Sequence, residues 1–308
     1  MFEIHIKNQL SLFIMVIRHL PHNSIDKKKW DDFISKANNG LIYAKSWYLD
    51  VVSPQWEALI SNDFKYVMPV PLKRKYKIPY IVQPYLTQQL GVFSNEPITE
   101  EIIRKFIQKL PSYSYQLNLN ACNFLPDANP FPNYILPLDN PYEILVKAYS
   151  KNTARNIDKA TKSKLNIIEH YNLDGFITFY QSISRKYKPT NCECMRALIA
   201  NGLQQGVFKL KAVTNEEGEI IAALCYTAFK NRLTYLIPVS NEKGKKESAM
   251  FYLVDTIIRQ ESGKDKMLDF EGSSIDGVAR FYKGFGAKNH PYYVIKNLRP
   301  SFLVGRIK

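Results

Sequence analysis

The chain has 308 residues, 45% of them hydrophobic, so one large core or two cores of about 150 residues each can form. Its formal net charge of +14 indicates an anionic partner, and transfer RNA, coenzyme A, a nucleotide-linked precursor and an acidic membrane surface all qualify. The four cysteines form no even framework and no apolar run approaches the roughly 18 residues that span a membrane, which excludes a disulfide scaffold and a transmembrane protein and favours the cytoplasm.

The first half of the chain predicts a mixed α/β unit. We expect helices at 26–37, 46–52 and 99–109, and strands at 13–18, 55–60, 64–72, 79–93, 115–120 and 133–137. Because Met15 could itself start the protein, the first fourteen residues are expected to matter little. Five of the seventeen prolines fall between 126 and 141, where they interrupt both helix and strand. We therefore predict two domains, 1–130 and 131–308.

The second half predicts the same order of elements at greater length. The expected helices lie at 141–163, 173–187, 191–204, 247–261 and 276–283, and the expected strands at 165–170, 207–214, 219–229, 232–239, 266–270 and 290–296. Short turns make the three central strands an antiparallel meander. The repeat rests on the order of elements, because no long sequence identity links the two halves.

Residues 267–290 combine a buried strand with a polar strand end. Residues 267–270 form the strand and residues 271–273 break it. Ser274 and Asp276 are suited to cap the helix that follows, and two glycines end that helix. A strand that delivers polar side chains into a helix and a glycine turn is a common construction for an acyl-transfer site.

This stretch resembles the last strand, helix and strand of the GNAT acetyltransferase superfamily, and more closely its tandem branch, the Fem-type aminoacyl transferases of peptidoglycan bridge synthesis. RFYKGFGA (280–287) is similar to the Arg/aromatic-Phe-Lys-x-Phe-Gly turn of that branch, and SKNTARNIDKA (150–160) to the helix that opens its second domain. The resemblance implies an α+β fold of two tandem GNAT-like α-β-α domains with mixed sheets. It also implies acyl transfer, with acyl-CoA or aminoacyl-tRNA as the donor and no certain cofactor.

Direct attack of an amine on an ester or thioester requires a proton acceptor and a proton donor rather than a covalent nucleophile. Glu271, just past the strand end, is the candidate general base. The resemblance to GNAT enzymes implies Tyr282 as the proton donor to the leaving group, and Arg280 and Lys283 are expected to offset charge on the donor. Alternatively, Glu271 caps the helix or pairs with Arg280, and Tyr282 packs in the core.

The helix expected at 141–163 carries a basic stripe. Lys151, Arg155 and Lys159 recur every four residues and share one face. This face is suited to a phosphate-bearing substrate, while the alternative is an ordinary solvated helix surface. We expect the stripe to face the two candidate catalytic residues across one functional cleft, with glutamines contributed by the first domain.

The loop after the third meander strand stands where GNAT enzymes hold the pyrophosphate of coenzyme A on backbone amides at a helix N-terminus. Gly244 matches the first glycine of that loop, but Lys246 stands where glycine or alanine is expected. A bulky residue there restricts the approach of the backbone and puts coenzyme A in doubt. Lys245 and Lys246 remain suited to bind a phosphate.

Three glutamines and one tyrosine in the first half are candidate substrate contacts. Gln83, Gln88 and Gln89 crowd a strand–turn region among apolar neighbours, and Tyr48 lies in an aromatic segment. Each could instead pack in the core or satisfy backbone groups. No spacing of histidines or cysteines indicates a metal site.

Together these patterns favour an acyl or aminoacyl transferase that acts on an amine, with a cell-wall precursor as one candidate acceptor. One alternative is a CoA-dependent N-acetyltransferase of a small molecule. The other is a non-catalytic binding or scaffold protein of the same fold, which a degraded cofactor loop would explain. Peripheral contact with a membrane is compatible with each of these.

Overall fold

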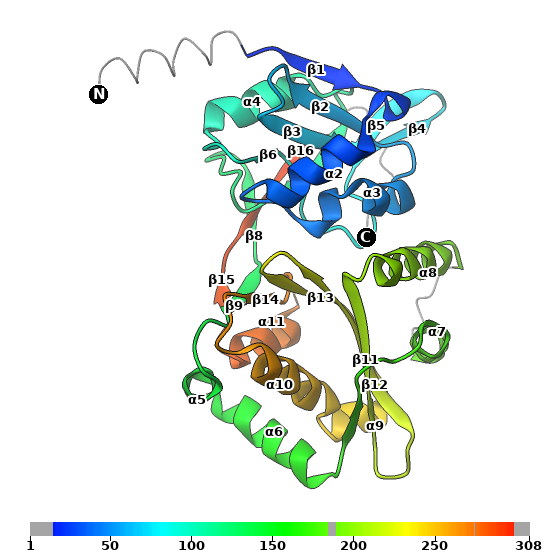
Figure 1. Cartoon of the computed structure of the whole chain (residues 1–308), viewed down its shortest axis with the longest axis vertical. Coiled ribbons are helices and arrows are strands. Elements are labelled where there is room, and N and C mark those ends of the chain that lie inside the picture. The colour runs from blue at the N-terminus through cyan, green and yellow to red at the C-terminus, as the bar shows by residue number, and fades with distance from the viewer. Residues whose placement is uncertain (1–14, 184–188, 274, 299–308) are drawn as a thin grey trace. The chain divides into compact units, whose positions relative to one another are not determined.

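The computed structural model describes residues 15–183, 189–273 and 275–298, which form two compact units (Figure 1). The chain leaves the first unit after Phe131 and returns to it at Tyr292, so residues 132–291 form the second unit. The division near 131 lies within the predicted proline-rich boundary. The predicted extent of the second domain, 131–308, was wrong at its end, because the last strand pairs within the first unit.

The first unit contains two sheets. A four-stranded antiparallel sheet has the order β1-β2-β3-β6, with bounds Ile17–Leu20, Glu57–Ser61, Tyr66–Val70 and Phe93–Ser94. A five-stranded mixed sheet has the order β4-β5-β7-β16-β8, with bounds Leu72–Lys75, Ile78–Val82, Tyr115–Leu119, Tyr292–Asn297 and Asn129–Phe131. Among the described residues of this unit, three α-helices accompany them, α2 (Lys27–Lys36), α3 (Ser46–Val52) and α4 (Glu100–Gln108).

The helices of the first unit begin and pack as their sequences indicate. Asp26 caps α2 by accepting the N–H of Lys29, and Thr99 caps α4 by accepting that of Ile102. The buried indole of Trp30 on α2 lies 5.0 Å from that of Trp56, measured between ring centroids. Aromatic burial of this kind holds α2 to the strands.

The second unit is built on one seven-stranded mixed sheet with the order β10-β11-β12-β13-β14-β9-β15. Its strands are β9 (Tyr134–Pro137), β10 (Asn166–Ile168), β11 (Phe208–Thr214), β12 (Ile220–Phe229), β13 (Arg232–Ser240), β14 (Met267–Asp269) and β15 (Lys288–Asn289). Its helices are α5 (Tyr142–Leu145), α6 (Lys151–Lys162), α7 (Leu173–Ile183), α8 (Pro189–Gln204), α9 (Glu242–Lys246), α10 (Ala249–Glu261) and α11 (Asp276–Gly284). The predicted meander is β11-β12-β13, and the mixed α+β class is confirmed.

Four predicted elements differ from the structure. The helix expected at 141–163 breaks at Tyr149, which is extended, so that Ser150 can cap α6. The strand expected at 79–93 stops at Val82, because residues with positive φ, Leu86 and Gly91, turn the chain before β6. The strand expected at 133–137 is β9 of the second unit rather than part of the first. The strand expected at 290–296 is β16, which pairs with β7 and β8 of the first unit.

No helix among the described residues is both long and apolar enough to cross a membrane.

Candidate functional site

The parallel strands β13 and β14 diverge at the centre of the second unit. They pair over three residues only, Arg232 to Thr234 against Met267 to Asp269. Beyond that point β13 runs on to Ser240, and no strand of the described chain pairs with it on the side of β14. A strand edge without a neighbour presents backbone N–H and C=O groups to an extended ligand. The residues that follow Asp269 therefore lie beside an open strand edge.

Glu271 lies at this divergence and is held by its backbone. Its N–H donates to Asp269 Oδ1 over 2.9 Å, and its carbonyl accepts the N–H of Tyr134 over 2.8 Å. Its φ of +58° is in the left-handed region, which is strained for a residue with a side chain. Asp269, which is buried, forms an ion pair of 2.6 Å with Arg232. The strand end is thus fixed in a conformation that its own sequence does not favour.

The N-cap position of the helix that follows Glu271 carries no capping side chain. The residue there is Ile275, whose side chain forms no capping hydrogen bond. Asp276 is the first helical residue rather than the cap, and Ser274 lies outside the described residues. Arg280 is exposed and forms no ion pair with any carboxylate that the structure describes. Of the two structural alternatives for Glu271, pairing with Arg280 is not found among the described residues, and capping stays an alternative.

Tyr282, on α11, lies in the core next to the strand end. It is 7% exposed, and its ring stacks on Phe270 with centroids 5.0 Å apart. Burial, and then the negative charges of Glu271 and Asp269, raise the pKa of Tyr282 well above its ordinary value of 10.0. The phenol therefore stays protonated at neutral pH, as a proton donor must.

Tyr235 is a candidate site residue that the sequence analysis missed. It lies on β13 at the start of the open edge, and its ring is 5.9 Å from that of Tyr282 in an edge-to-face contact. Burial, and then the neighbouring Tyr282, raise the pKa of Tyr235 well above its ordinary value. Tyr235 lies within a predicted strand, and its sequence neighbours do not distinguish it from an aromatic residue of the core.

The basic stripe of α6 is exposed. Lys151, Arg155 and Lys159 are exposed, whereas Thr153 and Ala160, on the opposite face, are buried. That the stripe faces Glu271 and Tyr282 across one cleft stays a prediction.

Helices α6 and α11 meet where the N–H of Ser150 donates to the carbonyl of Gly284 over 2.8 Å. Lys283, the residue before Gly284 on α11, is exposed, and its Nζ lies 5.5 Å from the ring centre of Tyr134. The cations of these two helices that form no ion pair within residues 15–183, 189–273 and 275–298 are Lys151, Arg155, Lys159, Arg280 and Lys283. These exposed side chains lie on two helices in contact, and the set is named here the α6–α11 surface.

The loop compared with the coenzyme A loop is helical. Asn241 caps α9 by accepting the N–H of Gly244 over 2.8 Å, and the N–H groups of Lys245 and Ser248 donate to Asn241 and Lys245 carbonyls. Amides that are already paired within the helix are not free to hold a pyrophosphate. Gly244 is required by packing, because a Cβ there would lie 2.1 Å from the carbonyl oxygen of Ile221.

The lysines of that loop are only partly available. Lys245 pairs with Glu242 over 2.7 Å, and Lys243 bridges Glu217 and Glu219. Lys246 is exposed and has no ion-pair partner in the part of the chain that the structure describes. Of the three residues predicted to bind a cofactor, Lys246 alone keeps a side chain suited to an added phosphate.

The candidate contacts of the first unit serve its own structure. Gln83 donates to the carbonyl of Thr87 and accepts the N–H of Asn118, and Gln88 accepts from Gln89. Gln89 is buried and accepts the N–H of Ala121. These contacts match the alternative in which amides satisfy backbone groups at an irregular strand.

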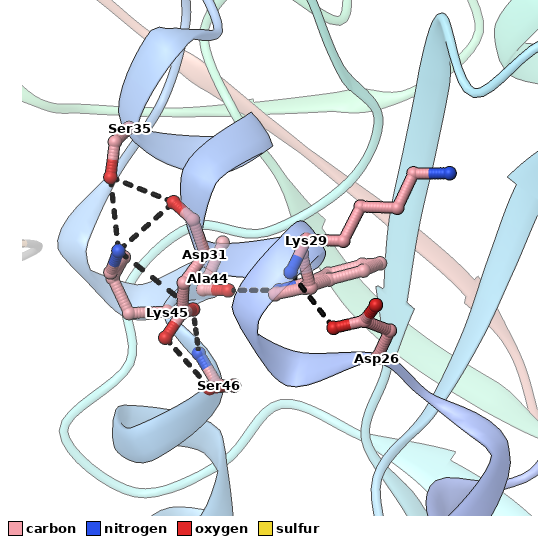
Figure 2. Close-up of polar contacts among 8 residues, drawn as sticks. Asp26, Lys29, Asp31, Ser35, Ala44, Lys45 and Ser46 are labelled. Atoms are coloured by element: carbon pink, nitrogen blue, oxygen red, sulfur yellow. Dashed lines mark hydrogen bonds and ion pairs between the residues drawn. The ribbon is translucent and has the colours of Figure 1, made fainter.

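Tyr48 is fully buried, and its hydroxyl donates to the carbonyl of Leu86. The segment around it is fixed by a half-buried polar cluster (Figure 2). Asp31 of α2 accepts both the N–H and the hydroxyl of Ser46, over 2.6 and 2.8 Å, and so caps α3 from a neighbouring helix. Lys45 donates to the carbonyl of Asp31 and to Ser35 Oγ, each over 3.0 Å.

Burial raises the pKa of Asp31, against the hydrogen bonds from Ser46, and burial lowers the pKa of Lys45, against the charge of Asp31. Every shift in this cluster follows from contacts within the unit. We therefore interpret the cluster as a clamp between α2 and α3 rather than as a ligand site.

No family model and no curated protein matches the chain. Several solved structures match its fold. The structure called FemX superposes with a TM-score of 0.68 at 11% identity, covering 94% of this chain and 99% of that one. L-PGS from Bacillus licheniformis gives 0.55 at 9% identity, covering 88% and 92% of the two chains. The C-terminal domain of a candidate lysylphosphatidylglycerol synthetase from Agrobacterium fabrum gives 0.54 at 9% identity, covering 87% and 90%. At these identities the likeness establishes the fold alone, and the expected Fem-type fold is confirmed.

Proposed function

We propose that this chain, which has the fold of FemX, is an acyl or aminoacyl transferase that moves an acyl group from an activated donor to an amine. The observation that carries the proposal is the pair of Glu271 and Tyr282 at the divergence of β13 and β14. A carboxylate fixed at a strand end and a buried, protonated phenol are the two groups that such a reaction requires. The fold alone does not establish the activity.

In the proposed reaction the amine attacks the carbonyl carbon of the donor ester. A C–N bond forms, the C–O bond to the leaving group breaks, and Glu271 accepts the proton that the amine loses. Tyr282 donates its proton to the leaving oxygen, and exchange with water restores both groups. The charge of Glu271 contributes to the raised pKa of Tyr282, which supports assigning the two groups to one site.

We propose aminoacyl-tRNA rather than acyl-CoA as the donor. The helical form of residues 242–246 supports this choice, because the amides of Gly244 and Lys245 are paired within the chain. The five unpaired cations of the α6–α11 surface also support it, since a long polyanion gains from a broad basic surface more than a compact cofactor does. The Fem-type resemblance implies the amine of a peptidoglycan precursor as the acceptor.

Two alternatives have support of their own. Lys246 remains suited to a phosphate, which favours a CoA-dependent N-acetyltransferase of a small molecule. The occupied amides of α9 favour a binding or scaffold protein that has lost the cofactor of its fold. A single comparison separates the three functions.

That comparison supplies the protein with labelled aminoacyl-tRNA or acetyl-CoA and a set of amine acceptors, and follows label transfer by mass spectrometry. Transfer from aminoacyl-tRNA is the expected result. Transfer from acetyl-CoA alone would replace our proposal with the CoA-dependent alternative. Absence of transfer from either donor, combined with retention of an unaltered small molecule during purification, would favour the binding protein.

A further inference from the structure

The hairpin formed by β4 and β5 has a basic outer face. Lys73 pairs with Tyr80 and Lys75 with Ile78, so these four side chains share one side of the hairpin. The other side carries Leu72 and Ile81, which are buried in the core of the first unit. The hairpin therefore has one face turned to the protein and one turned to solvent. It is the edge of its sheet (Figure 1, cyan).

The tip of the hairpin has an unusual sequence for its conformation. Tyr76 and Lys77 connect the strands, and both have positive φ, +52° and +65°. A two-residue turn with two positive φ angles is normally made of asparagine and glycine, which adopt this conformation with little strain. With a tyrosine and a lysine at these positions, the turn is less stable than the same turn made of asparagine and glycine. Strain kept at an exposed tip indicates that the side chains themselves are needed.

Apolar groups gather at this tip. Tyr76 is 80% exposed and Ile78 is 42% exposed. Tyr113, 88% exposed, lies in a loop alongside β5, because the hydroxyl of Ser112 donates to the carbonyl of Pro79 over 2.8 Å. Residues 72–82 include no acidic side chain. Lysines on an edge strand also prevent pairing with another sheet, but that role does not require an exposed tyrosine and isoleucine.

We propose that this hairpin docks on a bilayer surface that carries anionic phospholipids. Tyrosine and isoleucine gain free energy in the region of the headgroups, and lysines that flank them bind lipid phosphates. Charge complementarity supports the choice, since three lysines in residues 73–77 accompany a chain of net charge +14. An RNA backbone would use the cations but would leave Ile78 without a partner. The docking is independent of the proposed transfer reaction.

The first test is flotation of the full chain with vesicles of phosphatidylcholine that contain or lack phosphatidylglycerol. Binding is expected only with phosphatidylglycerol. Replacing Lys73, Lys75 and Lys77 by glutamine should weaken it about 100-fold, from roughly fivefold for each lysine. The matched control replaces Lys28, Lys36 and Lys109, three exposed lysines of the same unit, and so removes the same charge. Equal losses in the two variants would overturn the proposal.

The second test separates docking from folding. The double substitution Tyr76→Asn and Lys77→Gly supplies the residues that the turn prefers, so the melting temperature should rise while vesicle binding falls at least tenfold. Unchanged vesicle binding in this variant would overturn the proposal. So would a wild-type chain that binds RNA through the hairpin and leaves the vesicles unbound.

Discussion

The carboxylate of Asp269 accepts a hydrogen bond of 2.9 Å from the backbone N–H of Glu271. The same carboxylate lies 2.6 Å from the guanidinium of Arg232, so an ion pair between the first paired residue of β13 and the last of β14 holds the side chain that fixes the next strand end. The backbone of Glu271 is strained, and Asp269 is the contact that offsets this strain. The position of the candidate base therefore depends on a buried charge that does not itself react.

Glu271→Gln is expected to lower transfer at least 100-fold, because the amide cannot accept the proton of the amine. The melting temperature should change little, since the backbone rather than the carboxylate holds this residue. Label transfer and thermal unfolding measure the two effects. Asp265→Asn, at an exposed carboxylate, is the matched control. A fall of several degrees in melting temperature would instead make Glu271 a structural residue.

Asp269→Asn is expected to destabilise the fold by about 3 kcal/mol, because removal of one partner leaves Arg232 uncompensated at a partly buried position. Urea unfolding measures the change. The comparison is Asp174→Asn, which breaks the exposed pair with Arg196 and should cost less than about 1 kcal/mol. Similar losses in the two variants would show that the Arg232 pair is no stronger than a surface contact.

The raised pKa of Tyr282 predicts that the folded protein loses stability in alkaline solution. Its folded pKa is raised above the ordinary value of 10.0, so the unfolded chain loses this proton first as the pH rises. The contribution is complete below pH 10 and declines above it. Tyr282→Phe should make the decline shallower in unfolding measurements between about pH 9 and 11. Tyr113→Phe, at an exposed position, should leave the profile unchanged.

Gly244→Ala should destabilise the second unit by about 1–3 kcal/mol, because the added methyl group meets the carbonyl oxygen of Ile221. Gly277→Ala meets nothing within 4 Å and lies in α11, so it should be neutral or raise stability by up to about 1 kcal/mol. Chemical unfolding of both variants tests the pair. An unchanged free energy of unfolding for Gly244→Ala would show that packing does not require this glycine, and it would again be a candidate ligand contact.

The α6–α11 surface predicts salt-dependent binding of polyanions. Replacing Lys151, Arg155 and Lys159 by glutamine should reduce the slope of log K against log salt by about 2, from about 0.7 for each phosphate of a single strand. Filter binding of transfer RNA at several salt concentrations measures the slope. Calorimetry with coenzyme A is the counterpart, and micromolar or tighter affinity there would reverse the proposed order of donors.

Local sequence was sufficient for most helices and for the central meander. In those segments the period of apolar residues and the turn or cap residues agree, as at Asp26, Thr99 and Asn215 to Gly218. The strand end at Glu271 was also recognisable, because an apolar run stops abruptly at polar and glycine residues. Short-range physical chemistry determines these features, so they can be read from neighbours along the chain.

Tertiary structure alone decided which strands are neighbours. β16 is close in sequence to β15 but pairs with β7, and β9 lies between β14 and β15 although it precedes both by more than a hundred residues. Pairing of this kind depends on long-range packing, which no local pattern records. The same holds for Tyr235 and the Arg232–Asp269 pair, because the charge and burial that distinguish them come from residues distant in the sequence. Local sequence determined most of the elements and the candidate base Glu271. The pairing of the strands determined which side chains surround Glu271.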